Sequence, residues 1–226
     1  MALTALPLPA AVIFDIDGTL LDSESVIREL WQESMRHFGF TLSHEVHQRL
    51  LGRRLADVDA TLHAHFGEAI PISLIRERVK HAYEHQAQLG QIKLKPGVHD
   101  IIDALDEFHI PRAVATSTGI QRARQMLQWS GLEFAVVTGG DEVKQGKPAP
   151  DIFLETAQRL KVTAERCWVI EDSHIGITSA LAAGMHAVMV PDLMPPLPDH
   201  PWVVPNLIDI ATHLRRTLSH AATIYA

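Results

Sequence analysis

The stretch that decides the fold is AVIFDIDGTLLDS, residues 11–23. Residues 12–14 form a short run of apolar, β-favouring side chains, typical of a strand buried on both faces of a parallel sheet. Asp15 and Asp17 follow two residues apart, so in an extended chain both carboxylates point off the carboxyl edge of that sheet. Gly18 then permits a turn with positive φ. Open α/β sheets bind ligands at this edge, and two converging carboxylates favour a hard divalent cation such as Mg²⁺.

The composition is that of an ordinary globular protein, with 46% hydrophobic and 21% charged residues in 226. The net charge of −7, without a basic cluster, argues against nucleic acid or an anionic membrane as a partner. Cys167 is the only cysteine, which excludes an intrachain disulfide and fits a reducing compartment. Because the first residues make a poor signal peptide and no apolar run could span a membrane, we expect a cytoplasmic protein, a monomer or small homo-oligomer.

A block of helices follows the first strand. Apolar residues at helical spacing predict four short amphipathic helices, with stripes at about residues 26–38, 46–51, 55–62 and 75–83. Ser43 is a suitable N-cap for the second helix. Since no strand pattern separates these helices, we expect a small bundle over residues 22–92, inserted into a core domain made of residues 1–21 and 93–226.

Alternating strands and helices return after Pro96. The apolar runs predict strands at 112–117, 134–138, 167–170 and 186–190, and helices at about 98–108, 121–129, 151–160, 174–183 and 208–218. This alternation predicts an α/β fold, a Rossmann-like, doubly wound parallel sheet.

Polar residues stand at the ends of the expected core strands. Thr116 and Ser117 could bind phosphate oxygens with their hydroxyls or could simply cap the next turn. Lys147 lies in the rigid loop GKPAPD, residues 146–151, where a lysine alone carries no signal. Glu171 and Asp172 form a second acidic pair, which on its own could serve the dipole of the following helix.

Together these features resemble, in order, the four signatures of the haloacid dehalogenase-like hydrolase superfamily: Asp15-x-Asp17, Thr116, Lys147 with Pro148, and Glu171-Asp172. The resemblance covers nearly the whole chain and is strongest to the β-phosphoglucomutase and small-metabolite phosphatase branch, whose helical cap occupies the position of the insert. It implies Mg²⁺ as cofactor, an α-helical cap of the first class and a small phosphorylated metabolite as substrate.

The resemblance also implies a role for each site residue. Asp15 would be the nucleophile that forms an aspartyl-phosphate, and Asp17 the general acid and base. The metal would bind Asp15, the backbone carbonyl of Asp17 and Asp172, with Glu171 as a further candidate ligand. The phosphate would be held by the side chains of Thr116, Ser117 and Lys147. In the cap, Gly52, Arg53 and Arg54 stand where related caps often contact substrate, although a solvated arginine pair explains Arg53 and Arg54 equally well.

Two alternatives to a phosphatase remain open at this stage. Sugar phosphomutases that resemble this chain carry a histidine ten residues after the second Asp, whereas this chain has Ile27 there. Because an alkyl side chain transfers no proton, we expect net hydrolysis of a sugar or polyol phosphate. The second alternative is a phospho-accepting signalling receiver, which also uses acids, a hydroxyl and a lysine on a parallel sheet but lacks the helical insert. The seven histidines of the insert we interpret as surface and core residues.

Overall fold

The structure, a computed structural model, describes residues 3, 6–50, 53 and 55–224. Its centre is a parallel five-stranded sheet with the strand order β3-β2-β1-β4-β5. The strands are β1 (Ala11–Phe14), β2 (Arg112–Thr116), β3 (Val136–Gly139), β4 (Cys167–Glu171) and β5 (His186–Met189). The expected α/β fold with a parallel sheet is thereby confirmed, and the strand that carries the first acidic pair lies in the middle.

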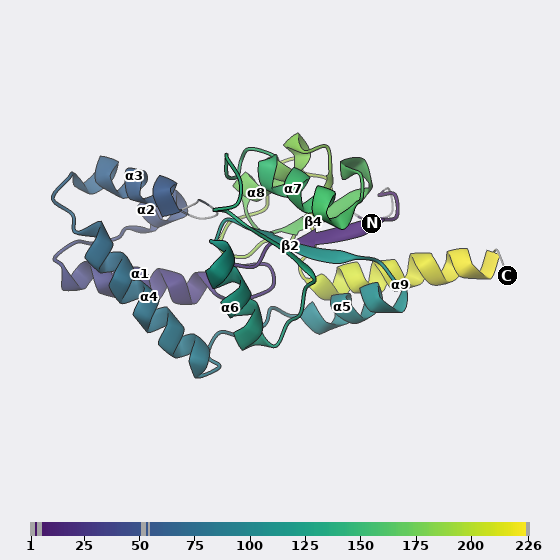
Figure 1. The fold of residues 1–226 in the computed structure, drawn as a ribbon, viewed down its shortest axis with the longest axis horizontal. Helices are drawn as coiled ribbons and strands as arrows, with labels where there is room; N and C mark the ends of the chain where they lie inside the picture. The colour runs from purple at the N-terminus through teal and green to yellow at the C-terminus, as the bar shows by residue number, and fades with distance from the viewer. Residues whose placement is uncertain (1–2, 4–5, 51–52, 54, 225–226) are drawn as a thin grey trace.

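The sheet is covered on both faces, as the mostly apolar sequences of its strands require. Val12 and Phe14 belong to the cluster that packs under α5 (Val98–Glu107), α6 (Ile120–Ser130) and α9 (Leu207–Ile224). Ala11 and Ile13 point the other way, into the cluster under α7 (Asp151–Leu160) and α8 (His174–Ala182). Figure 1 shows α7 and α8 on one side of the strands and α5 and α9 on the other.

Two expected elements of the core differ from the prediction by two or more residues at one end, whereas the other core elements agree within one residue. The third strand begins at Val136 rather than at 134, and Phe134, just before it, packs its ring edge-on against Phe14, with the two ring centroids 6.0 Å apart. The closing helix α9 continues beyond 218, the expected end, to Ile224, since no glycine or proline follows in the sequence to stop it. A short 3₁₀ turn, Ala164–Arg166, leads into β4 and was not predicted.

The helices α1 (Glu24–His37), α2 (His44–Gln48), α3 (Leu55–Phe66) and α4 (Ile72–Gln88) lie between β1 and α5 in the chain and to one side of the sheet (Figure 1). Their positions match the predicted apolar stripes. Ser43 caps α2 as expected, accepting a hydrogen bond from the backbone N–H of Val46 at 3.2 Å. α1 and α4, the longest of these four, pack against each other, and Leu30 and Met35 of α1 share one buried cluster with Ile75 and Val79 of α4.

The chain leaves the sheet for these helices and returns at the same place. The backbone N–H of Asp22 donates to Lys93 O at 2.8 Å, and that of Lys95 donates to Leu20 O at 2.9 Å. Leu21 and Leu94 form an antiparallel bridge between these bonds. The division into residues 1–21 plus 93–226 and 22–92 stays a prediction, which this pairing supports.

None of the helices in the described parts of the chain combines the length and the apolar character that a membrane span needs.

Candidate active site

A buried lysine joins the two strands that carry acidic residues at the carboxyl edge of the sheet. Lys147 Nζ lies 2.6 Å from Asp15 Oδ1 and 2.8 Å from Glu171 Oε1, and it also donates to the carbonyl of Ala115 at 3.3 Å. Asp15 follows β1 directly, Glu171 ends β4 and Ala115 belongs to β2. The lysine therefore sits over three neighbouring strands, where the sequence predicted that these polar residues converge.

The loop that carries Lys147 is fixed by the core beneath it. The ammonium group lies 5.1 Å from the centroid of the Phe153 ring in α7, within the range of a cation–π contact. The hydroxyl of Ser179 in α8 donates to Ala149 O at 2.6 Å, which ties the loop to the neighbouring helix. A lysine in a strand-to-helix loop is usually solvated, and these contacts explain why this one is only 3% exposed.

Glu171 uses both of its carboxylate oxygens within the protein. While Oε1 binds Lys147, Oε2 accepts from the backbone N–H and the hydroxyl of Ser173, at 2.7 and 2.8 Å. Ser173 in turn caps α8 by accepting from Gly176 N–H at 3.0 Å. A Cβ at Gly176 would stand 1.7 Å from Glu171 Oε1, so the start of α8 leaves room only for glycine. Both oxygens of Glu171 are thus hydrogen-bonded within the protein, one to Lys147 and the other to Ser173.

Two hydroxyl groups hold the second aspartate, Asp17. Ser23 Oγ donates to Asp17 Oδ1 at 2.5 Å, and Thr118 Oγ1 donates to Oδ2 at 3.0 Å. Gly18, at φ +79°, makes the turn that the sequence predicted and brings its N–H to Leu21 O at 2.9 Å. A Cβ at Gly18 would stand 2.3 Å from Asp172 Oδ2, which shows how closely the first acidic turn approaches the second.

Burial governs the protonation of this cluster. It raises the pKa of Asp15 to about 7, although Lys147 opposes the shift. Burial, together with the charges of Glu171 and Asp15, raises the pKa of Asp172 well above its usual range. Burial by itself lowers the pKa of Lys147, but the two carboxylates beside it outweigh that effect and the net shift is upward. One lysine does not balance the carboxylates, and a further cation would relieve them.

Asp15, Glu171 and Asp172 each offer a carboxylate oxygen, and these oxygens lie within 4.8 Å of one another. Among the described residues this is the only group of three or more acidic, histidine or cysteine side chains with that property. An all-oxygen donor set suits Mg²⁺ or a similar hard cation, which usually completes its shell with water and phosphate. The residues therefore fit a divalent metal, with Asp15 and Asp172 the better ligands because Glu171 is already engaged by Lys147 and Ser173.

The predicted phosphate-binding hydroxyls lie at the end of β2. Thr116 is buried, and its Oγ1 accepts the backbone N–H of Thr118 at 3.2 Å, so it shapes the turn as the capping interpretation required. Ser117 is half-buried beside it. A phosphate-binding role for either stays a prediction.

The predicted cap residues are only in part described. Arg53 is exposed and, with Arg49, lines a groove of about 500 Å³ between α2 and α3. Gly52 and Arg54 lie outside the described residues. A substrate contact by any of them stays a prediction.

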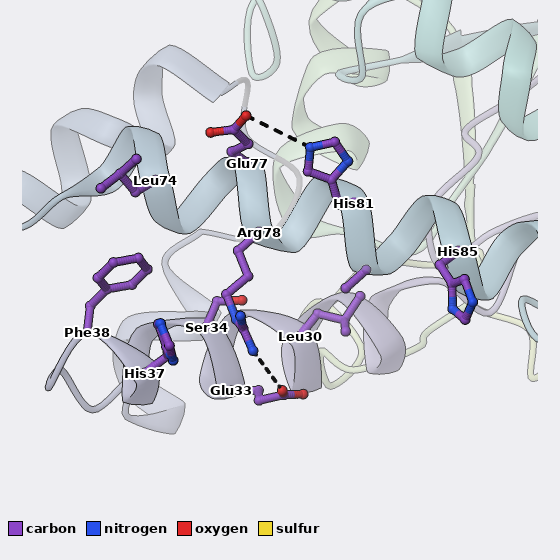
Figure 2. Close-up of a pocket in the computed structure, with 11 residues that line it drawn as sticks. Leu30, Glu33, Ser34, His37, Phe38, Leu74, Glu77, Arg78, His81 and His85 are labelled. Atoms are coloured by element: carbon purple, nitrogen blue, oxygen red, sulfur yellow. Dashed lines mark hydrogen bonds and ion pairs between the residues drawn. The ribbon is translucent and has the colours of Figure 1, made fainter.

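The histidines of the insert line a groove of their own. His37, His81 and His85 border a groove of about 590 Å³ between α1 and α4. Figure 2 shows His81 turned toward Glu77, 3.9 Å away, while His85 points elsewhere. Across the groove, Arg78 reaches Glu33 at 3.3 Å. Among the described residues these histidines form no group of three or more side chains that could hold a metal ion.

The sequence prediction assigned no site role to two further residues near Asp17, Thr118 and Glu24. Thr118 follows the expected hydroxyl pair, and only the turn after β2 aims it at Asp17. Glu24 opens α1, where an acidic residue ordinarily serves the helix dipole. Burial and the charges of Asp17 and Asp15 raise the pKa of Glu24 well above its usual range, so its carboxyl is within electrostatic reach of these two residues. The sequence signal for Glu24 was its position directly after Ser23.

A parallel sheet with two acidic turns and a buried lysine at its carboxyl edge defines the class of this protein. The family model described as haloacid dehalogenase-like hydrolase matches residues 12–190, and the chain belongs to this family. It is therefore a hydrolase, as the resemblance implied.

Several of its curated relatives are named as phosphatases of small metabolites. The chain is 35% identical over 188 residues to the fructose-1-phosphate phosphatase YqaB of Escherichia coli, covering 80% of this chain and 96% of that protein. It is 33% identical to a phosphorylated carbohydrates phosphatase of Thermotoga maritima, over 79% of this chain and 83% of the relative. Among solved structures, a putative β-phosphoglucomutase from Thermotoga maritima superposes with a TM-score of 0.72 at 28% identity, covering 91% of this chain and 98% of the other. The expected branch of the family is confirmed.

Proposed function

We propose that the chain is a Mg²⁺-dependent phosphatase that hydrolyses a small phosphorylated sugar or polyol through an aspartyl-phosphate on Asp15. The observation that carries the proposal is the buried contact of Lys147 with Asp15 and Glu171, beside Asp172 at the same sheet edge. A nucleophilic carboxylate for phosphorus must be ionised and fixed in direction, and a lysine 2.6 Å from one of its oxygens supports both.

The first half of the reaction uses Asp15 and Asp17. A carboxylate oxygen of Asp15 attacks the phosphorus in line, and the bond between phosphorus and the ester oxygen breaks. Lys147 stabilises charge on the phosphoryl oxygens as the bond breaks. The departing alkoxide takes a proton from the carboxyl of Asp17, which the hydroxyls of Ser23 and Thr118 hold in place. A Mg²⁺ ion bound by Asp15, Asp172 and the backbone carbonyl of Asp17 would neutralise part of the phosphate charge.

The second half regenerates the enzyme. Asp17, now a carboxylate, accepts a proton from a water molecule, and the water oxygen attacks the phosphorus of the aspartyl-phosphate. The bond between phosphorus and Asp15 breaks, which releases inorganic phosphate and restores the free carboxylate. Asp17 thus gives a proton in one step and takes one in the other, so the proton balance closes over a turnover.

The surroundings of Asp17 support a leaving group rich in hydroxyls. Glu24 adds a carboxyl within electrostatic reach of Asp15 and Asp17, and such groups accept hydrogen bonds from sugar or polyol hydroxyls. The helices α1–α4 act in this proposal as a cap that shields the site from bulk water during the first step. The printed names of the relatives, which include a (DL)-glycerol-3-phosphatase at 34% identity, point to the same substrate class.

A phosphomutase is the second candidate, because β-phosphoglucomutase-like structures are among the neighbours. Against it stands Ile27, where the resembling mutases carry a histidine. Its side chain packs against the apolar cluster of the insert and transfers no proton. We therefore expect phosphate release at every turnover. The assay supplies β-glucose 1-phosphate, Mg²⁺ and a trace of the 1,6-bisphosphate, and glucose 6-phosphate forming much faster than free phosphate would establish the mutase instead.

The main test of the proposal compares wild type with Asp15→Asn on a panel of sugar, polyol and aryl phosphates with Mg²⁺. The amide is isosteric but cannot attack phosphorus, so turnover should fall by at least about 10³-fold. Asp103→Asn, at an exposed position of α5, is the control for the loss of one carboxylate on the core. Activity of Asp15→Asn within about tenfold of wild type would contradict the assignment of the nucleophile.

A further inference from the structure

One polar side chain of the insert is buried against the core without a hydrogen bond. Tyr83 in α4 is 1% exposed, and its hydroxyl makes no hydrogen bond of ordinary geometry with the described residues. Burial and the nearby carboxylate of Asp17 raise the pKa of this hydroxyl, and the Ser23 hydroxyl lies beside it. The hydroxyl is therefore a neutral donor placed at the general acid, and a buried donor without a partner is rarely retained without a use.

The core holds the ring of Tyr83 in this position. Arg122, in the first turn of α6, places its guanidinium 4.4 Å from the ring centroid. The same guanidinium lies 4.0 Å from Glu84, the next residue of α4. Arg122 thus contacts two consecutive residues of the insert, and α4 and α6 lie side by side in Figure 1.

The contact between Tyr83 and Arg122 is connected to Asp17 through two hydroxyl groups, those of Thr118 and Ser23. α6 begins directly after the turn that carries Thr118, whose hydroxyl donates to Asp17 Oδ2. Ser23, beside the Tyr83 hydroxyl, donates to Oδ1. The Ser23 hydroxyl has one hydrogen, which it donates to Asp17. Its oxygen can therefore still accept a hydrogen bond from the Tyr83 hydroxyl.

We propose that Tyr83 is a positioning residue for Asp17. Arg122 and Glu84 hold its ring, and its hydroxyl donates to Ser23 Oγ during the reaction, so that Ser23 keeps its own proton directed at Asp17. The general acid is then fixed only while the insert contacts the core. This inference rests on the proposed phosphatase function and adds to it the contact through which the insert acts on proton transfer.

The variant Tyr83→Phe tests this role, because it keeps the ring on Arg122 and removes only the hydroxyl. Positioning of the acid matters most when the leaving group is a poor one. We expect kcat on glycerol 3-phosphate to fall about tenfold with KM within about twofold of wild type, while kcat on p-nitrophenyl phosphate stays within about threefold. An equal loss on both esters, or no loss on glycerol 3-phosphate, would overturn the proposal.

A second variant tests the support of the ring. Arg122→Gln should reproduce the selective loss on glycerol 3-phosphate, and the double variant with Tyr83→Phe should lose less than the sum of the two effects. Arg124→Gln, an exposed arginine on the same helix, is the matched control and should behave as wild type. Strictly additive losses would overturn the role of Arg122. A wild-type protein inactive on both esters would overturn the proposed function itself, whereas an active wild type with an unaffected Tyr83→Phe overturns this inference alone.

Discussion

Replacing Lys147 with methionine should destabilise the metal-free protein in a way that depends on pH. The methionine keeps an unbranched side chain of similar length but leaves Asp15 and Glu171 buried without their cation, where the lysine now lies 2.6 and 2.8 Å from them. Removing one partner of a buried ion pair costs about 3–5 kcal/mol. We expect the free energy of unfolding to fall by about this amount near neutral pH.

The pH dependence follows from the pKa of Asp15, which is raised to about 7 even beside Lys147. Without the lysine that pKa rises further, so the folded variant retains a proton that the unfolded chain has lost. Stability of the variant then falls as the pH rises above 7, by about 1.4 kcal/mol per unit, or about 2 kcal/mol between about pH 7 and pH 8.5. Wild type, whose Asp15 loses its proton near pH 7, should lose only about 0.4 kcal/mol of unfolding free energy over the same range.

The assay is urea unfolding in EDTA at these two pH values, with Lys144→Met as control. Lys144 is exposed on the same loop, so its replacement should change stability by less than about 0.5 kcal/mol. A variant Lys147→Met within about 1 kcal/mol of wild type at both pH values would refute the reasoning, because the buried pair would then contribute nothing.

Three further predictions concern metal binding and the insert. EDTA should abolish phosphatase activity and Mg²⁺ restore it, with Ca²⁺ a poor substitute, and Asp172→Ala should raise the Mg²⁺ concentration for half-maximal activity at least about tenfold. Gly18→Ala should also raise the Mg²⁺ concentration for half-maximal activity, since its Cβ would stand 2.3 Å from Asp172 Oδ2. The control is Gly39→Ala, which has a similar φ of +83° but no neighbouring atoms, and therefore measures the effect of backbone strain alone. Burial lowers the pKa of His47 to about 4, so as the pH falls this histidine is protonated in the unfolded chain before it is protonated in the folded protein. The free energy of unfolding of wild type should therefore fall by on the order of 2 kcal/mol between about pH 7 and 5. His47→Gln should lack that loss in urea unfolding, and an unchanged pH dependence in this variant would contradict the assignment.

The sheet and the acidic turns could be predicted from the sequence because their signals are local. Residues 12–14 are apolar at every position, and Asp15 and Asp17 stand directly at the strand end, so the side chains needed no distant partner to be placed. Lys147 was different, since nothing in its loop indicates burial. Only the resemblance to the family assigned it to the site, and the contacts with Phe153 and Asp15 now give the physical reason.

The contacts between the insert and the core could not be predicted in this way. Thr118 reaches Asp17 across 101 residues of chain, and Tyr83 meets Arg122 on a helix of the other part of the protein. Tyr83 sits on the apolar stripe of α4, where an aromatic residue is ordinarily core. Its hydroxyl became informative only when the structure placed Asp17 and Ser23 around it.

The paired backbone segments at Asp22 and Lys93 have a consequence for how such a protein diversifies. Since the outgoing and returning chains are hydrogen-bonded neighbours, all of α1–α4 forms an excursion from one point of the sheet. An excursion of this kind can be shortened, lengthened or exchanged for another without moving any strand end, because the register at Leu21 and Leu94 stays the same. Under the proposed function, genetic exchange across this junction would change the leaving-group preference in a single event, while Asp15, Asp17 and Lys147 are inherited unchanged.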